Sequence, residues 1–252
     1  MPDRTAITEK LCNTLEPLPF VNAFWLEGAD AIGTVDEYSD IDYWIDIVDA
    51  YEEQAYEAVE NALSELAEID YKYVMQHSHP QIRQRIYHLQ GTSEYLMIDF
   101  CWQLHSRPKV EYTYIENDNV EAVKVIFDKN SVISYKPLDL SEYAKWNTKR
   151  FDEAKYRRAQ HNRVMKYVHR GLYLEAYAYY NRYALEPLID LLRLVNTPAY
   201  ANYYLVHISH HIPSDERERL EYFAKISSLD EIAEKTPEAG DWFDELVERV
   251  EI

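Results

Sequence analysis

The chain has 252 residues, which is enough for one large domain or two modest ones with a real hydrophobic core. Its formal net charge of −19 argues against nonspecific binding to a long nucleic acid, because the phosphate backbone would be repelled. No run approaches the roughly 20 apolar residues of a membrane span and no secretory signal opens the chain, so we expect a reduced, cytoplasmic protein with no membrane association.

The first half of the chain alternates between patterns typical of strands and of helices. Residues 51–66 place apolar side chains at a helical period on an acidic exterior, whereas residues 69–74 mostly alternate between polar and apolar. On this reasoning we expect helices at 5–15 and 51–66, and strands at 20–27, 41–48, 69–74, 82–89, 95–102 and 123–127. Region 1–140 is therefore predicted to be a mixed β-sheet domain with a few helices.

After about residue 140 the pattern becomes helical and stays so. Ser141 is a candidate N-cap for a long basic helix that reaches about His169, and Pro187 is expected to kink an apolar helix at 172–195. Further helices are expected at 199–210, 214–227 and 238–250, with Pro213 and Gly240 at their edges. The sequence thus predicts an α+β protein, with a sheet domain at 1–140 and a helical bundle at 141–252.

The stretch 24–47 contains the pattern that points most directly to chemistry. An apolar strand leads into a tight turn at Gly28, and a polar connection then leads to a second strand that opens with Asp40 and Asp42. Alternation along an extended strand sends both carboxylates to one face, with their Cα atoms roughly 6.5 to 7 Å apart. Two such acids could also be exposed groups on an edge strand, but the glycine turn upstream favours a site for one or two hard cations.

This layout resembles the nucleotidyltransferase superfamily that includes DNA polymerase beta. The residues that match its pattern are Leu26, Gly28, Ala29, Asp40, Ile41, Asp42 and Tyr43. The run from Ser39 to Asp42 is similar to that of small bacterial aminoglycoside and lincosamide adenylyltransferases. One departure is Ala29, which stands where the family usually has a serine whose hydroxyl contacts the triphosphate. Backbone N–H groups of the turn, at Gly28 and Ala29, remain candidates for phosphate binding.

The resemblance implies a third carboxylate on a neighbouring strand, and Asp99 fits. It is the only acid within the apolar run 95–102. By resemblance it would bind metal and act as the general base that takes the proton of the acceptor hydroxyl. The alternative is an ion pair with Arg83 or Arg85 across the sheet, because a carboxylate in so apolar a strand needs a cation of some kind.

Three further residues near the motif have open interpretations. Asp46 shares the strand face of Asp40 and Asp42 but lies further along, which suits a solvated or supporting acid. Asp30 is positioned to contact phosphate only through its backbone. Ser39 is equally suited to supporting the nucleotide phosphate and to serving as a simple turn residue.

A basic segment interrupts this acidic chain between residues 149 and 170. It holds eight Lys and Arg residues against two acids. We expect members of this group to neutralise the phosphates of a nucleotide, and the candidates are Lys149, Arg150, Lys155, Arg158 and Lys166. The alternative is a solvated helix face whose long side chains cover apolar surface.

Taken together, the motif and its resemblance to the nucleotidyltransferases imply an enzyme that transfers a nucleoside monophosphate to a hydroxyl of a small molecule. ATP is the expected donor, although another nucleoside triphosphate is open, and two Mg²⁺ ions would be held by Asp40, Asp42 and Asp99. An aminoglycoside- or lincosamide-like antibiotic is the expected acceptor, bound by the helical domain, and a homodimer with a shared site is compatible with the sequence. The alternative is a degenerate nucleotide-binding or antitoxin-like protein that acts through a protein partner, which the Ala29 departure favours.

Overall fold

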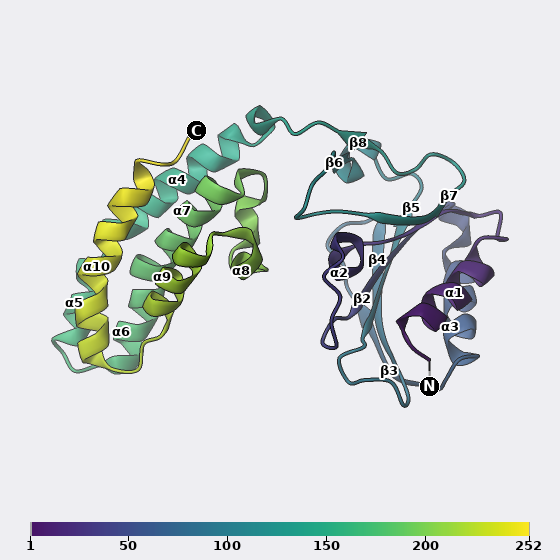
Figure 1. The fold of residues 1–252 in the computed structure, drawn as a ribbon, viewed down its shortest axis with the longest axis horizontal. Coiled ribbons are helices and arrows are strands. Elements are labelled where there is room, and N and C mark those ends of the chain that lie inside the picture. The colour runs from purple at the N-terminus through teal and green to yellow at the C-terminus, as the bar shows by residue number, and fades with distance from the viewer. Residues whose placement is uncertain (1, 252) are drawn as a thin grey trace. The chain divides into compact units, whose positions relative to one another are not determined.

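The computed structural model describes residues 2–251, and the chain divides into two compact units, Met1–Leu138 and Asp139–Ile252 (Figure 1). The first unit is built on a β-sheet and the second is helical, so the predicted α+β class is confirmed. Among residues 2–251, no helix combines the length and the apolar character needed to cross a membrane.

The sheet unit contains a six-stranded sheet, a separate two-stranded sheet and three α-helices within its described residues. In chain order its elements are α1 (Arg4–Leu15), β1 (Val21–Leu26), α2 (Gly28–Ile32), β2 (Ile41–Ile47), α3 (Glu52–Ser64), β3 (Ile69–Met75), β4 (Ile82–Leu89), β5 (Ile98–Leu104), β6 (Tyr114–Ile115), β7 (Lys124–Asp128) and β8 (Tyr135–Lys136). The large sheet has the strand order β3-β4-β5-β2-β1-β7, and its β2–β5 pair is parallel whereas its other pairs are antiparallel. The predicted mixed sheet is confirmed, and only the two-residue strands β6 and β8 had no sequence pattern to predict them.

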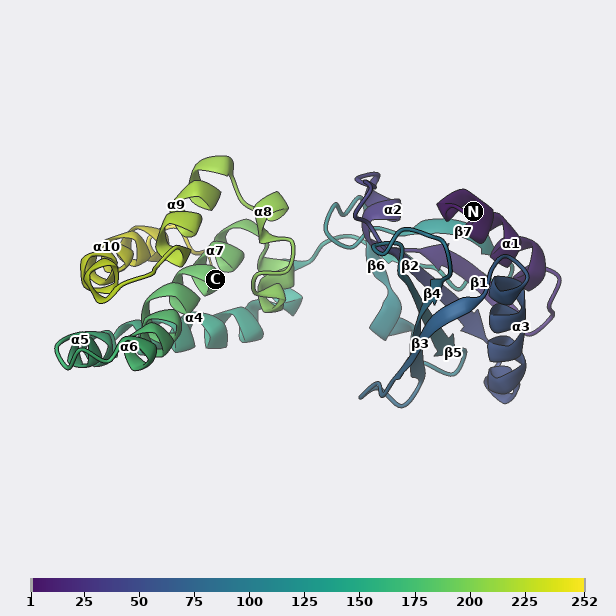
Figure 2. The ribbon, with the colours of Figure 1, turned by 90° about the horizontal axis from the view of Figure 1, so that it is seen from below.

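Helices α1 and α3 lie together on one face of the large sheet (Figure 2). Side chains that alternate along β2 and β5, including Tyr43, Ile45, Phe100 and Trp102, are fully buried in the core on this face. The residues between them point to the opposite face, as the pleat of a strand requires. Asp42 and Asp99 are among these residues, so the fold places both carboxylates on the face that α1 and α3 leave uncovered.

The helical unit is organised around α7, whose residues from Pro187 to Leu194 are all buried. Its α-helices are α4 (Ala144–Arg158), α5 (Asn162–Val168), α6 (Tyr173–Tyr180), α7 (Glu186–Asn196), α8 (Ile208–His211), α9 (Ser214–Ala224) and α10 (Leu229–Val247). Apolar side chains of α7 pack with Trp242 and Phe243 of α10 in one hydrophobic core.

The prediction of one long basic helix from Ser141 to His169 was wrong. The helix α4 ends at Arg158, and α5 begins at Asn162. Between Ala154 and Val164 no side chain is buried, so no apolar stripe holds this segment in a single straight helix. Ser141 is not an N-cap, because it lies in a 3₁₀ turn and its own N–H donates to Asp139 Oδ1 at 2.9 Å.

Two other helix predictions need correction. The expected helix 199–210 is a 3₁₀ segment, Pro198–Tyr203, followed by a loop, because Tyr204 and His207 adopt positive φ angles of 51° and 53° that end a right-handed helix. Gly240 lies inside α10 rather than at its edge. A Cβ there would stand 1.7 Å from Arg158 Nη2, so the glycine makes room for that guanidinium.

The expected irregularity near Pro187 takes the form of a π-helical turn. Residues Asn181–Leu185 form this wide turn between α6 and α7, and Pro187 sits in the first turn of α7. The helix runs without a gap from α6 through this turn into α7, so the wide turn precedes a proline, without an N–H to donate, inside a continuous helical segment.

A buried carboxylate ties α4 to α7. Asp190, on α7, is 3% exposed and accepts hydrogen bonds from Arg150 Nη1 at 2.8 Å and Arg157 Nη1 at 3.0 Å. Removing one partner of a buried ion pair leaves the other charge uncompensated, which is strongly destabilising.

We therefore expect Asp190→Ala to lower the free energy of unfolding of the helical unit by about 3 kcal/mol. Glu186→Ala is the matched control, because Glu186 also pairs with Arg157, at 3.2 Å, but is 30% exposed and should cost under about 1 kcal/mol. Urea unfolding followed by circular dichroism measures both. Equal losses would show that the buried pairing does not hold the two helices together.

Candidate active site

The parallel pairing of β2 with β5 sets Asp42 directly opposite Asp99. Adjacent strands lie about 4.8 Å apart, so the two half-buried carboxylates are neighbours on the uncovered face. Asp40 lies just before β2, and with Asp99 it lines a hollow of about 460 Å³ that also includes Tyr71, His88 and Glu94. The structure thus brings all three predicted catalytic acids to one region of the sheet unit.

Gly28 allows the Asp42 carboxylate to lie against the turn. Its φ angle is +57°, and a Cβ on this residue would stand 2.2 Å from Asp42 Oδ2. The backbone N–H of Glu27 donates to the carbonyl of Asp42 at 3.0 Å, which ties the turn to the start of β2. The positive φ angle and the lack of room for a Cβ therefore both require glycine at this position. Ala29 is the next residue and lies in the short helix α2.

The three acids repel one another electrostatically. Burial, followed by the charges of Asp40 and Asp99, raises the pKa of Asp42 to about 7. Burial also raises the pKa of Asp99, against the lowering effect of a hydrogen bond from Gln84. In the described chain, no Lys, Arg or His side chain forms an ion pair with any of the three, so their charges are not balanced by the protein.

The alternative role for Asp99, an ion pair with Arg83 or Arg85, does not occur. Both arginines point to the helix-covered face, where Arg83 pairs with Glu52 at 2.7 Å and Arg85 with Glu60 at 2.6 Å. Their positions follow from strand alternation, since the residue between them points to the other face.

The chemistry of this donor set suits a hard divalent cation. Carboxylate oxygens are the ligands that Mg²⁺ prefers, and a cation would offset both the burial and the neighbouring charges that raise the pKa of Asp42. Within residues 2–251, no three acid, histidine or cysteine side chains already converge on one point at metal-binding distance. Binding would therefore require at least one of the carboxylates of Asp40, Asp42 and Asp99 to turn toward the others, and the pairing of β2 with β5 holds the backbones of Asp42 and Asp99 side by side.

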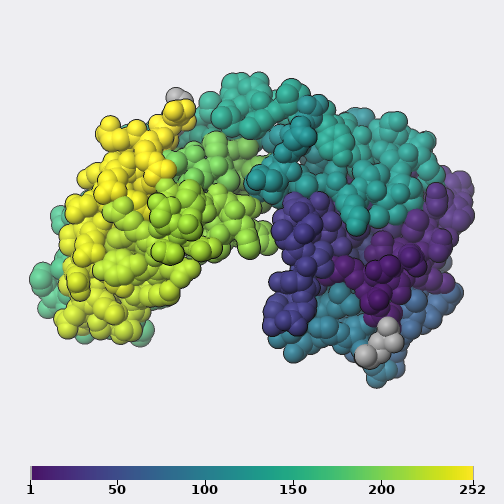
Figure 3. Space-filling view, in the orientation of Figure 1, coloured from purple at the N-terminus to yellow at the C-terminus, as the bar shows by residue number. Residues whose placement is uncertain are grey.

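The connection before β2 is held by a residue that sequence reasoning missed. Arg4 of α1 forms an ion pair with Asp30, donates to the Asp40 carbonyl at 2.8 Å and donates to the Ser39 carbonyl at 2.5 Å. Asp30 is thereby engaged in an ion pair, and the Ser39 hydroxyl donates to Asp36 Oδ1 at 2.8 Å within a turn. Most of the connection is exposed, and it is visible in dark violet-blue on the sheet unit in Figure 3.

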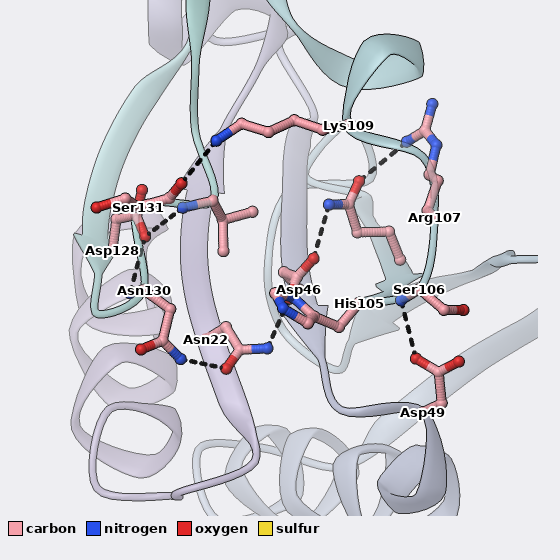
Figure 4. A network of polar contacts seen from close by, with 12 residues as sticks. Asn22, Asp46, Asp49, His105, Ser106, Arg107, Lys109, Asp128, Asn130 and Ser131 are labelled. Atoms are coloured by element: carbon pink, nitrogen blue, oxygen red, sulfur yellow. Dashed lines mark hydrogen bonds and ion pairs between the residues drawn. The ribbon is translucent and has the colours of Figure 1, made fainter.

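Asp46 is neither solvated nor in contact with the three acids. It is fully buried and accepts hydrogen bonds from Asn22 Nδ2 at 2.7 Å and Gln103 Nε2 at 2.8 Å, and its Oδ1 lies 2.7 Å from His105 Nδ1 (Figure 4). The alternation of side chains along β2 correctly predicted the side of the sheet to which Asp46 points. The strand pattern could not predict the loops that cover Asp46 at that end of the sheet. Asp46 is therefore the centre of a structural hydrogen-bond network.

Glu27 is a second residue that sequence reasoning missed. Its carboxyl accepts from Tyr114 Oη at 2.6 Å and Trp25 Nε1 at 3.1 Å, and burial raises its pKa. These bonds anchor strand β6 to the end of β1, directly before Gly28. An acid that ends an otherwise apolar strand was the signal that could have identified it.

The predicted phosphate ligands Lys149 and Lys155 belong to α4 of the helical unit. Each forms a local ion pair, Lys149 with Glu153 at 3.8 Å and Lys155 with Asp152 at 3.5 Å, and both are largely exposed. Arg150 is engaged by Asp190. The assignment of Lys149 and Lys155 to nucleotide phosphates remains a prediction.

No family model matches the sequence, and no curated protein matches it. Among solved structures, an aminoglycoside 6-adenyltransferase from Bacillus subtilis is similar at 13% identity and a TM-score of 0.36, covering 99% of this chain and 90% of that one. A spectinomycin adenyltransferase from Enterococcus faecialis, solved with ATP and spectinomycin, is similar at 9% identity and a TM-score of 0.35, covering 98% and 100%.

Replacing Gly28 with Ala should cost stability both through its left-handed backbone and through overlap with Asp42. Gly33→Ala is the matched control, because Gly33 also has a positive φ angle, of 77°, but no atom lies within 4 Å of the position that its Cβ would occupy. We expect Gly28→Ala to lower the free energy of unfolding by about 1–3 kcal/mol more than Gly33→Ala in urea titrations. Equal losses would contradict the close approach of Asp42 to the turn.

A pH dependence follows from the raised pKa of Asp42. Because the folded-state pKa, about 7, lies above the ordinary value of 3.8, the ionised side chain destabilises the fold as pH rises between these values. In the presence of EDTA, Asp42→Asn should therefore raise the melting temperature relative to wild type, by little near pH 4 and fully above pH 7. Thermal unfolding across this range measures the difference, and a gain that does not vary with pH would refute the assignment.

Proposed function

We propose that this chain is a metal-dependent nucleotidyltransferase that moves a nucleoside monophosphate, AMP from ATP, to a hydroxyl of a small acceptor. The observation that carries the proposal is the group of Asp40, Asp42 and Asp99 on the uncovered face of the sheet, without a protein cation among the described residues to balance them. A structural ion-pair network would have supplied such a cation.

Each residue has a definite role in this proposal. Asp40, Asp42 and Asp99 would hold Mg²⁺, which, when bound, stabilises charge on the transferring phosphate and on the departing pyrophosphate. Asp99 would accept the proton of the acceptor hydroxyl on a carboxylate oxygen. The backbone N–H groups at Gly28 and Ala29 would contact the triphosphate, with Lys149 and Lys155 as further phosphate ligands.

The hollow beside Asp40 and Asp99 supports an acceptor that carries positive charge. Its described lining includes the acids Asp40, Glu94 and Asp99 but no Lys or Arg. The lining His88 is already engaged, with its Nδ1 2.6 Å from Asp70 Oδ1. Charge complementarity therefore favours a cationic acceptor of the aminoglycoside kind over a neutral one, and a lincosamide-like antibiotic is the next candidate.

The second candidate is a degenerate nucleotide-binding or antitoxin-like protein that acts through a protein partner. Ala29 is the observation in its favour, since it offers no hydroxyl to the triphosphate. The presence of all three acids argues against this candidate.

Isothermal calorimetry with ATP, GTP and CTP in the presence of Mg²⁺ tests the proposal. We expect wild-type protein to bind one nucleotide, ATP, in a Mg²⁺-dependent manner, and the double variant Asp40→Asn/Asp42→Asn to lose at least about 1.4 kcal/mol of binding free energy, a tenfold effect. Glu37→Gln, which removes an exposed charge from the same connection, is the control and should bind as wild type does.

Absence of binding by wild-type protein would reject the transferase and favour an antitoxin-like protein that acts through a protein partner. Binding that persists in the double variant with unchanged Mg²⁺ dependence would place the nucleotide elsewhere. Where wild type binds ATP, an acceptor screen that follows pyrophosphate release identifies the substrate.

A further inference from the structure

One neutral side chain, Gln84 of β4, holds the Asp99 carboxylate. Its amide Nε2 lies 2.8 Å from Asp99 Oδ1 and 2.7 Å from Oδ2, so one donor bridges both oxygens. We propose that Gln84 is a positioning residue that fixes the orientation of the Asp99 carboxylate beside the cation site. This inference rests on the function proposed above.

Strand alternation explains why a glutamine reaches this place. In β4, the Cα partner of Asp99 is Ile86 and that of Cys101 is Gln84, so Gln84 lies on the same face as Asp99, one step along the sheet. Its neighbours Arg83 and Arg85 point to the helix-covered face, where both are paired with glutamates of α3. The sheet thus presents an amide, and neither guanidinium, to the Asp99 carboxylate.

The neutrality of the donor matters for a cation site. An arginine in the same place would balance the charge of Asp99 and compete with a bound metal ion. An amide hydrogen bond orients the carboxylate and leaves its full negative charge. A carboxylate has about four lone-pair positions, so two remain for a metal ion or a proton after the amide has bridged both oxygens.

The bridging contact also restricts how the carboxylate can turn. Asp99 is half-buried, and the Cys101 thiol, 3.8 Å from Oδ1, makes only a weak further contact with it. Without Gln84, the described residues would offer this carboxylate no strong side-chain hydrogen-bond donor. Groups that orient metal ligands in this way typically contribute a factor of 10 to 100 in metal affinity.

The test uses Gln84→Met, which keeps the length of the side chain and removes its N–H donor. Gln81→Met is the matched control, because Gln81 Nε2 donates instead to Ser106 Oγ at 2.7 Å, away from the acids. Mn²⁺ binding by the full chain, followed by electron paramagnetic resonance, should weaken about tenfold in Gln84→Met and remain unchanged in Gln81→Met. Circular dichroism should show that both variants are folded at the temperature of the measurement, so that a loss of Mn²⁺ affinity reports on Asp99 and not on unfolding.

A crystal structure of metal-free Gln84→Met gives an independent measure, in which we expect the Asp99 carboxylate to rotate or to occupy more than one conformation. Unchanged Mn²⁺ affinity in a protein that binds Mn²⁺, or an unchanged Asp99 side chain in the variant, would overturn the positioning role. If wild-type protein binds no Mn²⁺, the proposed function fails, and the position of Asp99 in the crystal structure decides the role of Gln84 alone.

Discussion

The parallel pairing of β2 with β5 is the constraint on which the candidate site depends. It places Asp42 opposite Asp99 on one face, while Tyr43 and Phe100, which alternate with them, are buried beneath α1 and α3. Because the apolar residues must face the helices, side-chain alternation along the strands puts the carboxylates on the opposite face of the sheet. Core packing therefore places two like charges side by side in a half-buried setting, which is unfavourable unless a cation joins them.

The surroundings maintain this arrangement without neutralising it. Gly28 leaves space for the Asp42 carboxylate, and Arg4 holds the preceding connection through Asp30 and two backbone carbonyls. Gln84 donates to Asp99 but carries no charge. The nearby cationic side chains of β4 are turned toward α3, so the fold supplies orientation to the acids and leaves charge balance to a ligand.

The sequence predicted the strands, the glycine turn and the shared face of the acids because each depends on short-range alternation. It also predicted the α+β class, since periodicity changes sharply near residue 140. It failed where tertiary packing decides the outcome. The break after Arg158 has no Gly or Pro to mark it, and Gly240 serves a close contact with Arg158 rather than a helix end. Asp46 is buried, and Gln84 and Glu27 find their partners, through contacts between strands and loops that are distant in the sequence. The residue pattern of a single strand does not predict which of these segments meet.

The most direct test of the central claim is anomalous X-ray diffraction from crystals grown with Mn²⁺ and a non-hydrolysable ATP analogue. We expect anomalous peaks among Asp40, Asp42 and Asp99, with the triphosphate beside the Gly28 turn. Clear density for the nucleotide with no metal peak at these three carboxylates, or a metal bound elsewhere on the chain, would contradict it.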